Sequence, residues 1–383
     1  MAKEAAMNTR TLFALYTLLL TLWWINDSFA AEVAIARTAE EKAPVFYTLT
    51  TQKPTTGTNT EDFLSDYFTD CIAEVVSETE STITFNLSFP NSSEFFVDPD
   101  LETGLRFFCG YVPPLHSLAY QFKETDKYIE ALNDSWTLLG WSKWFSRNYD
   151  SLSEDSTIVI IHFDDHTDFM SPRVSIREEG LFDLITGSRI DLRSPDSIIK
   201  AIQSTSIGIG SFFAPFIWEV QSKVKQIKIL HVSQRYEALP EFFKLEAEVR
   251  HESFPVECER LTLKLTPSEA ISDSGVDYVR TSELSNLLPF ISEGDRILVH
   301  FDLDCFNNRF DRDSDWASKA EIYNPNADAI HSAIKTACES LVSRYGLERL
   351  ENISIAYCPG FFPAEYWEAA HKILMSYLKG DLP

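Results

Sequence analysis

Two short motifs place acidic and histidine side chains directly after hydrophobic runs of the chain. The first motif follows the run 158–163 and the second follows the run 297–301. Their possible metal ligands are Asp164, His166 and Asp168 in the first motif, and Asp302 and Asp304 in the second. Because side chains alternate along a strand, the members of each set lie on one side of their strand. If the two strands are neighbours, five ligands converge on a carboxylate-rich site for two divalent metal ions.

Alternating strand and helix patterns surround these motifs and predict the scaffold that positions them. The expected strands are 105–112, 157–163, 226–232, 261–265, 296–301 and 353–357. Most are short apolar runs that suit buried parallel strands, and the clearest helix pattern covers 328–345. This alternation predicts an α/β fold, a three-layer α/β/α sandwich around a mostly parallel sheet. In such sheets functional residues lie at the carboxyl ends of the strands, where both motifs stand.

Composition and charge narrow the classes of partner. The chain has 383 residues, of which 44% are hydrophobic, enough for a large globular core. Its 33 basic and 58 acidic residues give a formal net charge of −25, which disfavours DNA or RNA because phosphate binding needs clustered Lys and Arg. A metal ion or a cationic substrate fits this charge better. The six cysteines form no C-x-x-C pair, which argues against a zinc knuckle, and Cys71 with Cys109 is a candidate disulfide pair.

Residues 1–30 have the pattern of a cleavable secretory signal peptide. An apolar stretch covers 12–25, and small residues stand at Ser28 and Ala30, the two cleavage positions. The stretch is shorter than the roughly 20 residues that span a membrane. We therefore expect an exported protein, periplasmic or secreted, with no stable membrane insertion after cleavage.

Residues 31–104 are polar and acidic, and we expect them to be an N-terminal elaboration of the core. Apolar residues at helical spacing predict a helix over 61–77, and alternation predicts a strand over 82–89. The segment contains no histidine. The chemistry is therefore assigned to one domain, 105–383.

The two motifs also carry a resemblance to a known enzyme superfamily. Asp-Asp-His-Thr-Asp at 164–168 resembles the Asp-x-His-x-Asp signature of the ureohydrolase (arginase and deacetylase) superfamily, and Phe-Asp-Leu-Asp at 301–304 resembles its second metal signature. The chain is most similar to the peptide arginases, which convert arginine side chains within peptides to ornithine. This closer likeness rests on the segments 164–172, 206–215, 302–310 and 313–316. The resemblance covers roughly residues 105–380.

An arginase-like fold and a centre of two Mn²⁺ ions are what the resemblance implies. One ion would be bound by Asp164, Asp168, Asp302 and a first histidine, and the other by His166, Asp304 and the shared Asp164 and Asp302. Carboxylates and imidazoles suit such a hard cation. Two ions of this kind activate water for attack on a guanidinium carbon, and the products are ornithine and urea. The implied partner is an arginine-containing peptide or a small guanidino compound.

The first histidine of the family pattern has no clear counterpart here. Small-molecule arginases carry it in a Gly-Gly-Asp-His segment before the first motif, and this chain has no such segment. The best substitute is His116, which follows the expected strand 105–112. It would be separated from Asp164 by an inserted helical segment over 123–145. The alternative is a loop histidine that makes only a hydrogen bond.

Three further residues beside the motifs have expected supporting roles. His162 and His300 each precede a leading aspartate by two residues, so they lie on the same face but deeper, as hydrogen-bonding partners of the ligands or as core residues. Asp165 points to the opposite side of its strand. A structural hydrogen bond is the favoured role for Asp165, and contact with the substrate, as a catalytic residue, is the alternative.

The acid that would bind the guanidinium is less well defined by the sequence. Family members supply it after the last strand, where Glu365 is the nearest acid, although Glu365 could instead begin the next helix. Asp311 and Asp313 are rivals for this role. Peptide recognition is implied by the resemblance alone, and the sequence does not specify the oligomeric state.

Two other classes of function compete with this interpretation. A phosphatase of the haloacid dehalogenase type also places Asp-x-Asp after an apolar strand, but it expects Thr or Val where Cys305 and Phe306 stand. An exported protein that binds metal without catalysis is the second class. Within the superfamily, zinc-dependent deacetylation is disfavoured because Asp168 and Asp304 together favour two metals over one.

Overall fold

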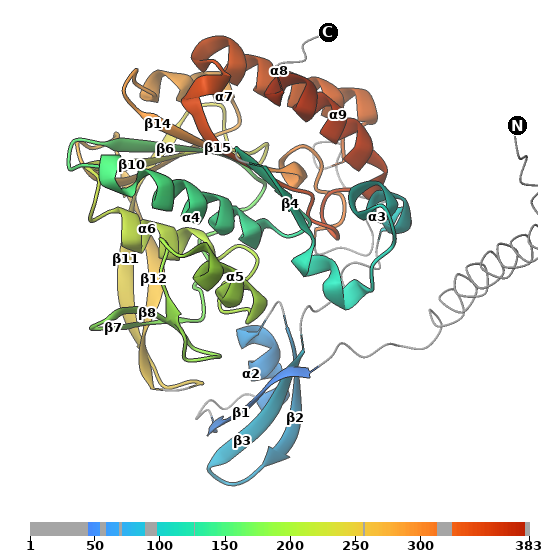
Figure 1. Ribbon diagram of the computed structural model, residues 1–383, viewed down its shortest axis with the longest axis vertical. Helices are drawn as coiled ribbons and strands as arrows, with labels where there is room; N and C mark the ends of the chain where they lie inside the picture. The colour runs from blue at the N-terminus through green and yellow to red at the C-terminus, as the bar shows by residue number, and fades with distance from the viewer. Residues whose placement is uncertain are drawn as a thin grey trace, which may run out of the picture. The chain divides into compact units, whose positions relative to one another are not determined.

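A mixed sheet of 12 strands is the centre of the fold in the part of the chain that the structure describes (Figure 1). The spatial order of its strands in this computed structural model is β4 (Phe122–Glu124), β5 (Tyr128–Ala131), β15 (Leu350–Ala356), β14 (Arg296–Asp302), β6 (Thr157–Phe163), β10 (Gln226–Val232), β13 (Gly275–Thr281), β11 (Glu241–Glu252), β12 (Cys258–Ser268), β7 (Val174–Arg177), β8 (Gly180–Asp183) and β9 (Arg189–Ile190). The described residues are 45–53, 59–68, 71–88, 98–125, 127–255, 257–311 and 324–379. They all belong to one compact unit, Val45–Pro383.

The strands from β5 to β13 in this order run parallel to one another. β6 and β10 are rich in Ile, Val and Leu and are buried along almost their whole length, which is typical of parallel strands covered on both faces. Phe163 of β6 is paired with Phe301 of β14, so these two strands end at the same level. The two acidic motifs therefore leave the sheet next to each other at its carboxyl edge.

The sequence predicts a mostly parallel sheet, but the sheet in the structure is mixed. Beyond β13, the strands β11, β12, β7, β8 and β9 pair antiparallel to their neighbours. The expected segment 261–265 is only the central part of β12. From Leu245 to Val249, β11 alternates apolar with acidic residues, a pattern typical of antiparallel strands with one face toward solvent.

Helices cover both faces of the parallel strands (Figure 1). One face carries α3 (Leu101–Cys109), α7 (Leu284–Leu287), α8 (Ala327–Tyr345) and α9 (Trp367–Leu378), and the other carries α4 (Thr137–Asn148), α5 (Pro195–Gln203) and α6 (Phe213–Val220). Val159 and Ile161 of β6 pack with the first set, whereas Ile158 and Ile160 pack with the second. Successive side chains of a strand point to opposite faces, so the two hydrophobic clusters lie on opposite sides of the sheet.

A smaller antiparallel sheet precedes the large one in sequence. It has the order β1 (Val45–Gln52), β3 (Thr82–Ser88), β2 (Ile72–Glu78), and helix α2 (Thr60–Tyr67) packs against β2. The strand expected over 82–89 is β3. The helix expected over 61–77 is wrong beyond Tyr67, because β-branched residues from Ile72 onward favour a strand. Phe254, at the turn between β11 and β12, packs into the hydrophobic cluster of this small sheet.

Two further expectations about local structure are wrong. Most of 105–112 is not a strand but part of helix α3. The buried positions of α3 recur at helical spacing: Leu101, Gly104, Leu105 and Phe108. Gly110 then ends the helix in the left-handed conformation, with φ of 78°. The segment 123–145 is not one inserted helix, because it contains β4 and β5 before α4 begins at Thr137.

The cysteines are all free thiols in this structure. The disulfide considered between Cys71 and Cys109 is therefore not formed. The Cys71 thiol lies 3.1 Å from the hydroxyl oxygen of Thr205, and the Cys109 thiol lies 3.8 Å from the side-chain oxygen of Gln121. Each of these two cysteines has its own polar neighbour.

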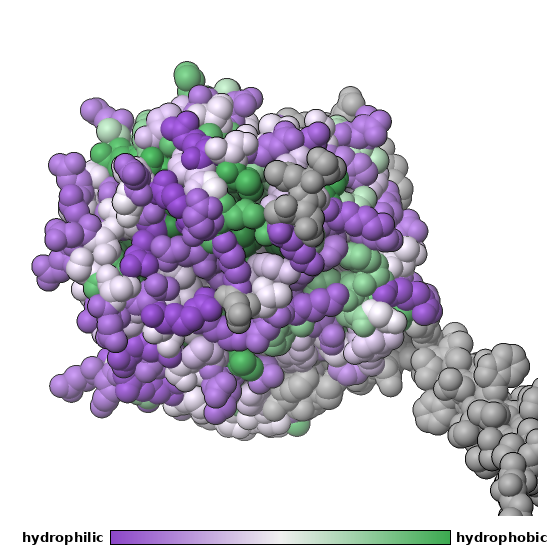
Figure 2. All heavy atoms as spheres, turned by 45° about the horizontal axis from the view of Figure 1, so that its top comes forward, coloured by the Kyte–Doolittle hydropathy of each residue, from purple (hydrophilic) through white to green (hydrophobic). Residues whose placement is uncertain are grey.

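The molecular face in Figure 2 is dominated by hydrophilic residues, with a smaller hydrophobic group near its centre. Within the described ranges, no helix is both long and apolar enough to cross a membrane. The expected signal peptide, 1–30, and the rival acid Asp313 lie outside the described residues.

Candidate metal centre

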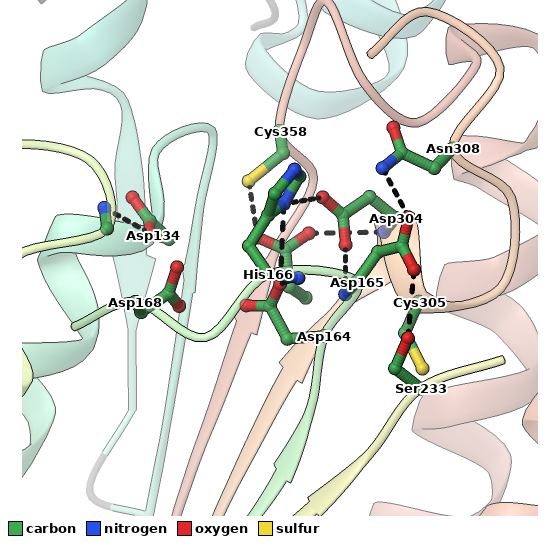
Figure 3. Close-up of polar contacts among 12 residues, drawn as sticks. Asp134, Asp164, Asp165, His166, Asp168, Ser233, Asp304, Cys305, Asn308 and Cys358 are labelled. Carbon is green, nitrogen blue, oxygen red and sulfur yellow. Dashed lines mark hydrogen bonds and ion pairs between the residues drawn. The ribbon is translucent and has the colours of Figure 1, made fainter. Parts of the chain in front are cut away.

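The carboxyl edge of the parallel strands gathers residues from five strand ends (Figure 3). They are Asp134 after β5, Cys358 after β15, Asp304 after β14, Asp168 after β6 and Ser233 after β10. Residues that lie far apart in the sequence meet here because parallel strands all end at this edge. It is the edge at which the sequence predicts both acidic motifs.

One group of possible metal ligands consists of Asp164, His166 and Asp304, which we name the outer group. Nδ1 of His166 lies 3.0 Å from Oδ2 of Asp304 and 3.6 Å from Oδ1 of Asp164. The His166 side chain is 33% exposed, so this group opens toward solvent. Burial lowers the pKa of His166, but attraction by Asp304 and hydrogen bonding to Asp164 outweigh burial, and the net pKa is raised.

A second group consists of His162, Asp164, Asp168 and His300, which we name the inner group. All four residues are buried, and their ligand atoms lie within 4.8 Å of one another. Nε2 of His162 is 3.7 Å from Oδ2 of both Asp164 and Asp168. Asp168 turns toward the group with a left-handed backbone, φ of 56°, which is unfavourable for a residue other than glycine. Asp164 thus belongs to both groups.

Unpartnered polar atoms show that the inner group fits a cation. Nε2 of His162, Oδ2 of Asp164, Oδ2 of Asp168 and Nε2 of His300 are buried and have no hydrogen-bond partner among the described residues. Such atoms are rare in folded proteins because burial without a partner is unfavourable. A divalent cation would supply the partner that the two carboxylate oxygens and one Nε2 lone pair lack, because the Nδ1–Nδ1 hydrogen bond between His162 and His300 puts the proton of one of these imidazoles on its Nε2. The structure therefore contains buried His and Asp groups that could hold metal ions.

Burial and mutual repulsion raise the pKa values of the carboxyl groups at this edge. Burial, followed by repulsion from Asp304 and Asp302, raises the pKa of Asp164 well above its usual value. Burial and then repulsion from Asp164 raise the pKa of Asp168 in the same way. The protein part of the site therefore disfavours several ionised carboxylates at once, and positive charge at this edge would favour them.

Three buried histidines form a row across the sheet just below the acids. His231 of β10, His162 of β6 and His300 of β14 are direct register partners. Nδ1 of His162 lies 2.9 Å from Nδ1 of His300, and His231 contacts the carbonyl oxygen of Asp164 (2.9 Å). Burial lowers the pKa of His300 to about 3 and, with repulsion from His231, lowers that of His162. Neutral imidazoles of this kind keep a lone pair for a cation or for each other.

His231 was not among the residues predicted for the site. The signal was present, since each of β6, β10 and β14 carries His in its last few positions, between apolar residues. What the sequence does not specify is the register that aligns them. The sequence predicts His162 and His300 as hydrogen-bonding partners of the ligands or as core residues, whereas the structure places both in the inner group.

Asp302 lies beside the two groups without belonging to either of them. Its Oδ1 accepts the backbone N–H of Asp304 (3.1 Å), and its Oδ2 accepts the thiol of Cys358 (2.7 Å). Burial and then repulsion from Asp302 raise the pKa of the Cys358 thiol. Cys358 is a second residue that sequence reasoning missed. It lies two residues after the end of β15, and the sequence alone does not reveal that this strand neighbours β14.

Asp165 is the centre of a separate hydrogen-bond network. It accepts the Ser233 hydroxyl (2.9 Å), the Asn308 side-chain amide (2.7 Å) and Nε–H of Arg235 (2.6 Å). Arg235 also donates through Nη2 to Asp311 (2.7 Å). One guanidinium group is thus bound by two acids, and Oδ2 of Asp311 lies 3.6 Å from Nε2 of His166 in the outer group.

The structure does not bring His116 or Glu365 into either metal-holding group of the described residues. His116 lies in a 3-10 turn, Leu115–Tyr120, and is partly buried. Glu365 accepts Nη1–H of Arg309 at 3.0 Å. Asp134, by contrast, is buried at the site, and its pKa is raised by burial and then by repulsion from Asp168. The sequence does not point to it, because the helical segment predicted over 123–145 covers the four-residue strand β5 and Asp134 itself.

A scan of protein-family models and a search of curated proteins both return no match for the chain.

Proposed function

We propose that this protein is a hydrolase with two divalent metal ions that cleaves the guanidinium group of arginine, within a peptide, to ornithine and urea. The observation that carries the proposal is the pair of buried His and Asp groups that share Asp164. One cation would be held by the inner group and the other by the outer group. The domain 105–383 would be arginase-like, a three-layer α/β/α sandwich, and the layered helices support this assignment.

The donor atoms favour manganese. Both groups offer only carboxylate oxygens and imidazole nitrogens, which suit Mn²⁺, and neither includes a thiolate. When bound, a pair of such cations polarises water and lowers its pKa toward neutrality, which supplies a nucleophile for the guanidinium carbon. The Cys358 thiol donates to Asp302 and so holds this carboxylate in place beside the groups.

The acids around the outer group show that this edge can bind a guanidinium. Asp165 and Asp311 already bind the guanidinium of Arg235, so carboxylates with suitable spacing stand next to His166. The 33% exposure of His166 gives access from solvent. A side chain that projects from a peptide could reach this edge without full burial of the peptide. The acidic chain and the expected signal peptide fit an exported enzyme with a cationic substrate and no nucleic acid.

The test is urea release by the purified chain with Mn²⁺, over arginine-containing peptides, free arginine and agmatine. We expect urea and a peptide lighter by CH2N2, because hydrogen replaces the amidino group, and loss of both products with Asp164→Asn. Asp150→Asn, at an exposed aspartate, is the matched control and should keep full activity.

Other outcomes would support the rival functions. Release of phosphate from phosphate esters with Mg²⁺, without urea, would favour a phosphatase. Tight Mn²⁺ binding without product from any guanidino compound would favour a metal-binding protein. Full activity of a folded Asp164→Asn variant would contradict the site itself.

A further inference from the structure

Asp134 has a carboxylate whose burial is not explained by the local fold. It begins the turn Asp134–Trp136 after β5, and 2% of it is exposed. The turn is already capped by Asn133, whose Oδ1 accepts the N–H of Ser135 at 3.0 Å. Oδ2 of Asp134 accepts the N–H of Gly210 at 2.9 Å. Oδ1 is buried and has no hydrogen-bond partner in the described part of the chain.

Gly210 connects this carboxylate to the inner group. Its backbone is left-handed, with φ of 69°, and its carbonyl accepts the N–H of Met170 at 2.9 Å. A Cβ added to Gly210 would lie 3.5 Å from Oδ1 of Asp168. Asp134 and Asp168 are therefore both neighbours of one glycine, and Figure 3 shows them on the same side of the site.

A purely structural role would not require a carboxylate at this position. One oxygen is enough to accept the Gly210 N–H, and the amide of asparagine would provide it without a buried charge. A buried carboxylate with one free oxygen is unfavourable unless a positive group compensates for it. No basic side chain is bonded to Asp134 among the described residues, where Gly210 is its hydrogen-bond donor.

We propose that Asp134 is a metal ligand of the inner group and takes the place that the resemblance gives to a first histidine. The proposal rests on the proposed metal centre and replaces His116 in it. The inner position would then be bound by Asp134, Asp164 and Asp168 together with an imidazole of the histidine row. A carboxylate in place of an imidazole makes this donor set harder. Such a set favours Mn²⁺ or Mg²⁺ over Zn²⁺.

The test measures metal binding directly and does not depend on urea release. The full chain is freed of metal, titrated with Mn²⁺ and with Zn²⁺ by calorimetry, and its bound metal is counted by elemental analysis. We expect two Mn²⁺ ions in the wild type. Asp134→Asn should keep one and bind the other at least tenfold more weakly. Asp134→His should keep two sites and shift the preference for Zn²⁺ over Mn²⁺ at least tenfold upward.

Asp98→Asn is the matched control. Asp98 is also a buried aspartate, but its two carboxylate oxygens accept the backbone N–H groups of Asp100 (2.9 Å) and Ala364 (2.7 Å), so neither oxygen lacks a partner as Oδ1 of Asp134 does. This variant should bind both ions as the wild type does. If Asp134→Asn binds two Mn²⁺ ions with unchanged affinity, or if Asp134→His leaves the metal preference unchanged, the proposal is wrong. If the wild type binds two ions but releases no urea, the hydrolase function fails and the ligand assignment stands.

Discussion

Neutralising Asp164 should have opposite effects on stability with and without metal. Asp164 belongs to both the inner and the outer group. The Asp164→Asn change keeps an oxygen for the backbone N–H of His166, which Oδ1 accepts at 2.5 Å, and removes the charge. Without metal, that charge is unfavourable, since burial and the neighbouring acids raise the pKa of Asp164. The metal-free variant should therefore be more stable than the metal-free wild type.

The size of both effects follows from the geometry. Ligand atoms of Asp164 and Asp168 lie within 4.8 Å, and two charges at that separation repel by about 3 kcal/mol at an effective dielectric constant of about 20. Protonation of the wild-type carboxyls relieves part of this repulsion, so Asp164→Asn should raise the unfolding free energy of the metal-free protein by about 1–2 kcal/mol. For a unit of about 340 residues, the unfolding entropy is about 0.7 kcal/mol per kelvin, so Tm should rise by about 1–3 °C. Mn²⁺ at a hundredfold its Kd should stabilise the wild type by about 2.7 kcal/mol per site, or about 8 °C for two sites.

Thermal unfolding with EDTA and with Mn²⁺ measures this reversal. The variant should melt above the wild type in EDTA and several degrees below it in Mn²⁺. Asp150→Asn should follow the wild type in both, because Asp150 is exposed. A variant that melts lower in EDTA and gains as much from Mn²⁺ as the wild type would refute both the crowding and the ligand role of Asp164.

Three other changes test separate parts of the structure. Arg235→Gln should lower the unfolding free energy by about 1–2 kcal/mol, because buried Asp165 loses an ionic partner that solvent partly screens; an unchanged urea midpoint would contradict this. Burial raises the pKa of Glu130, but hydrogen bonding from His371 (2.9 Å) outweighs it, so the net pKa is lowered. The stability that this hydrogen bond contributes is fully present above the unfolded-state pKa of about 4.3 and is lost as pH falls through the lower folded-state pKa. The difference in unfolding free energy between the wild type and Glu130→Gln, measured by denaturation between pH 6 and pH 3, should therefore narrow as pH falls. A difference that stays constant with pH would exclude this effect of Glu130. Cys358, a buried thiol with a raised pKa, should resist iodoacetamide in the folded protein and react in urea, and mass spectrometry of the native protein showing rapid alkylation would count against its placement.

The central strands of the fold are readable from the sequence because their burial leaves a plain pattern. β6 and β14 are short apolar runs that end in acids, and this was enough to predict both their type and their position at the carboxyl edge. The pattern fails where a strand is too short to show a period. β5 has four residues, and its misassignment hid Asp134, which follows it.

Register is the part of the site that the sequence does not encode locally. The alignment of His231, His162 and His300 depends on the pairing register of three strands, and no single segment specifies this register. The contact of Cys358 with Asp302 likewise requires β15 to neighbour β14. Ligands within one motif could thus be predicted from alternation, whereas partners from different strands could not.

In the proposed centre, the unequal burial of the two groups would set the order in which the two metal ions bind and are released. Asp168 and His300 are buried, whereas the His166 side chain is 33% exposed. In the proposed centre, an ion in the outer group would stand between solvent and the inner group. Loading would then begin with the inner ion, and a chelator would remove the outer ion first. The inner ion would exchange only as fast as the outer position empties, so a protein that carries a single ion should persist during both assembly and stripping.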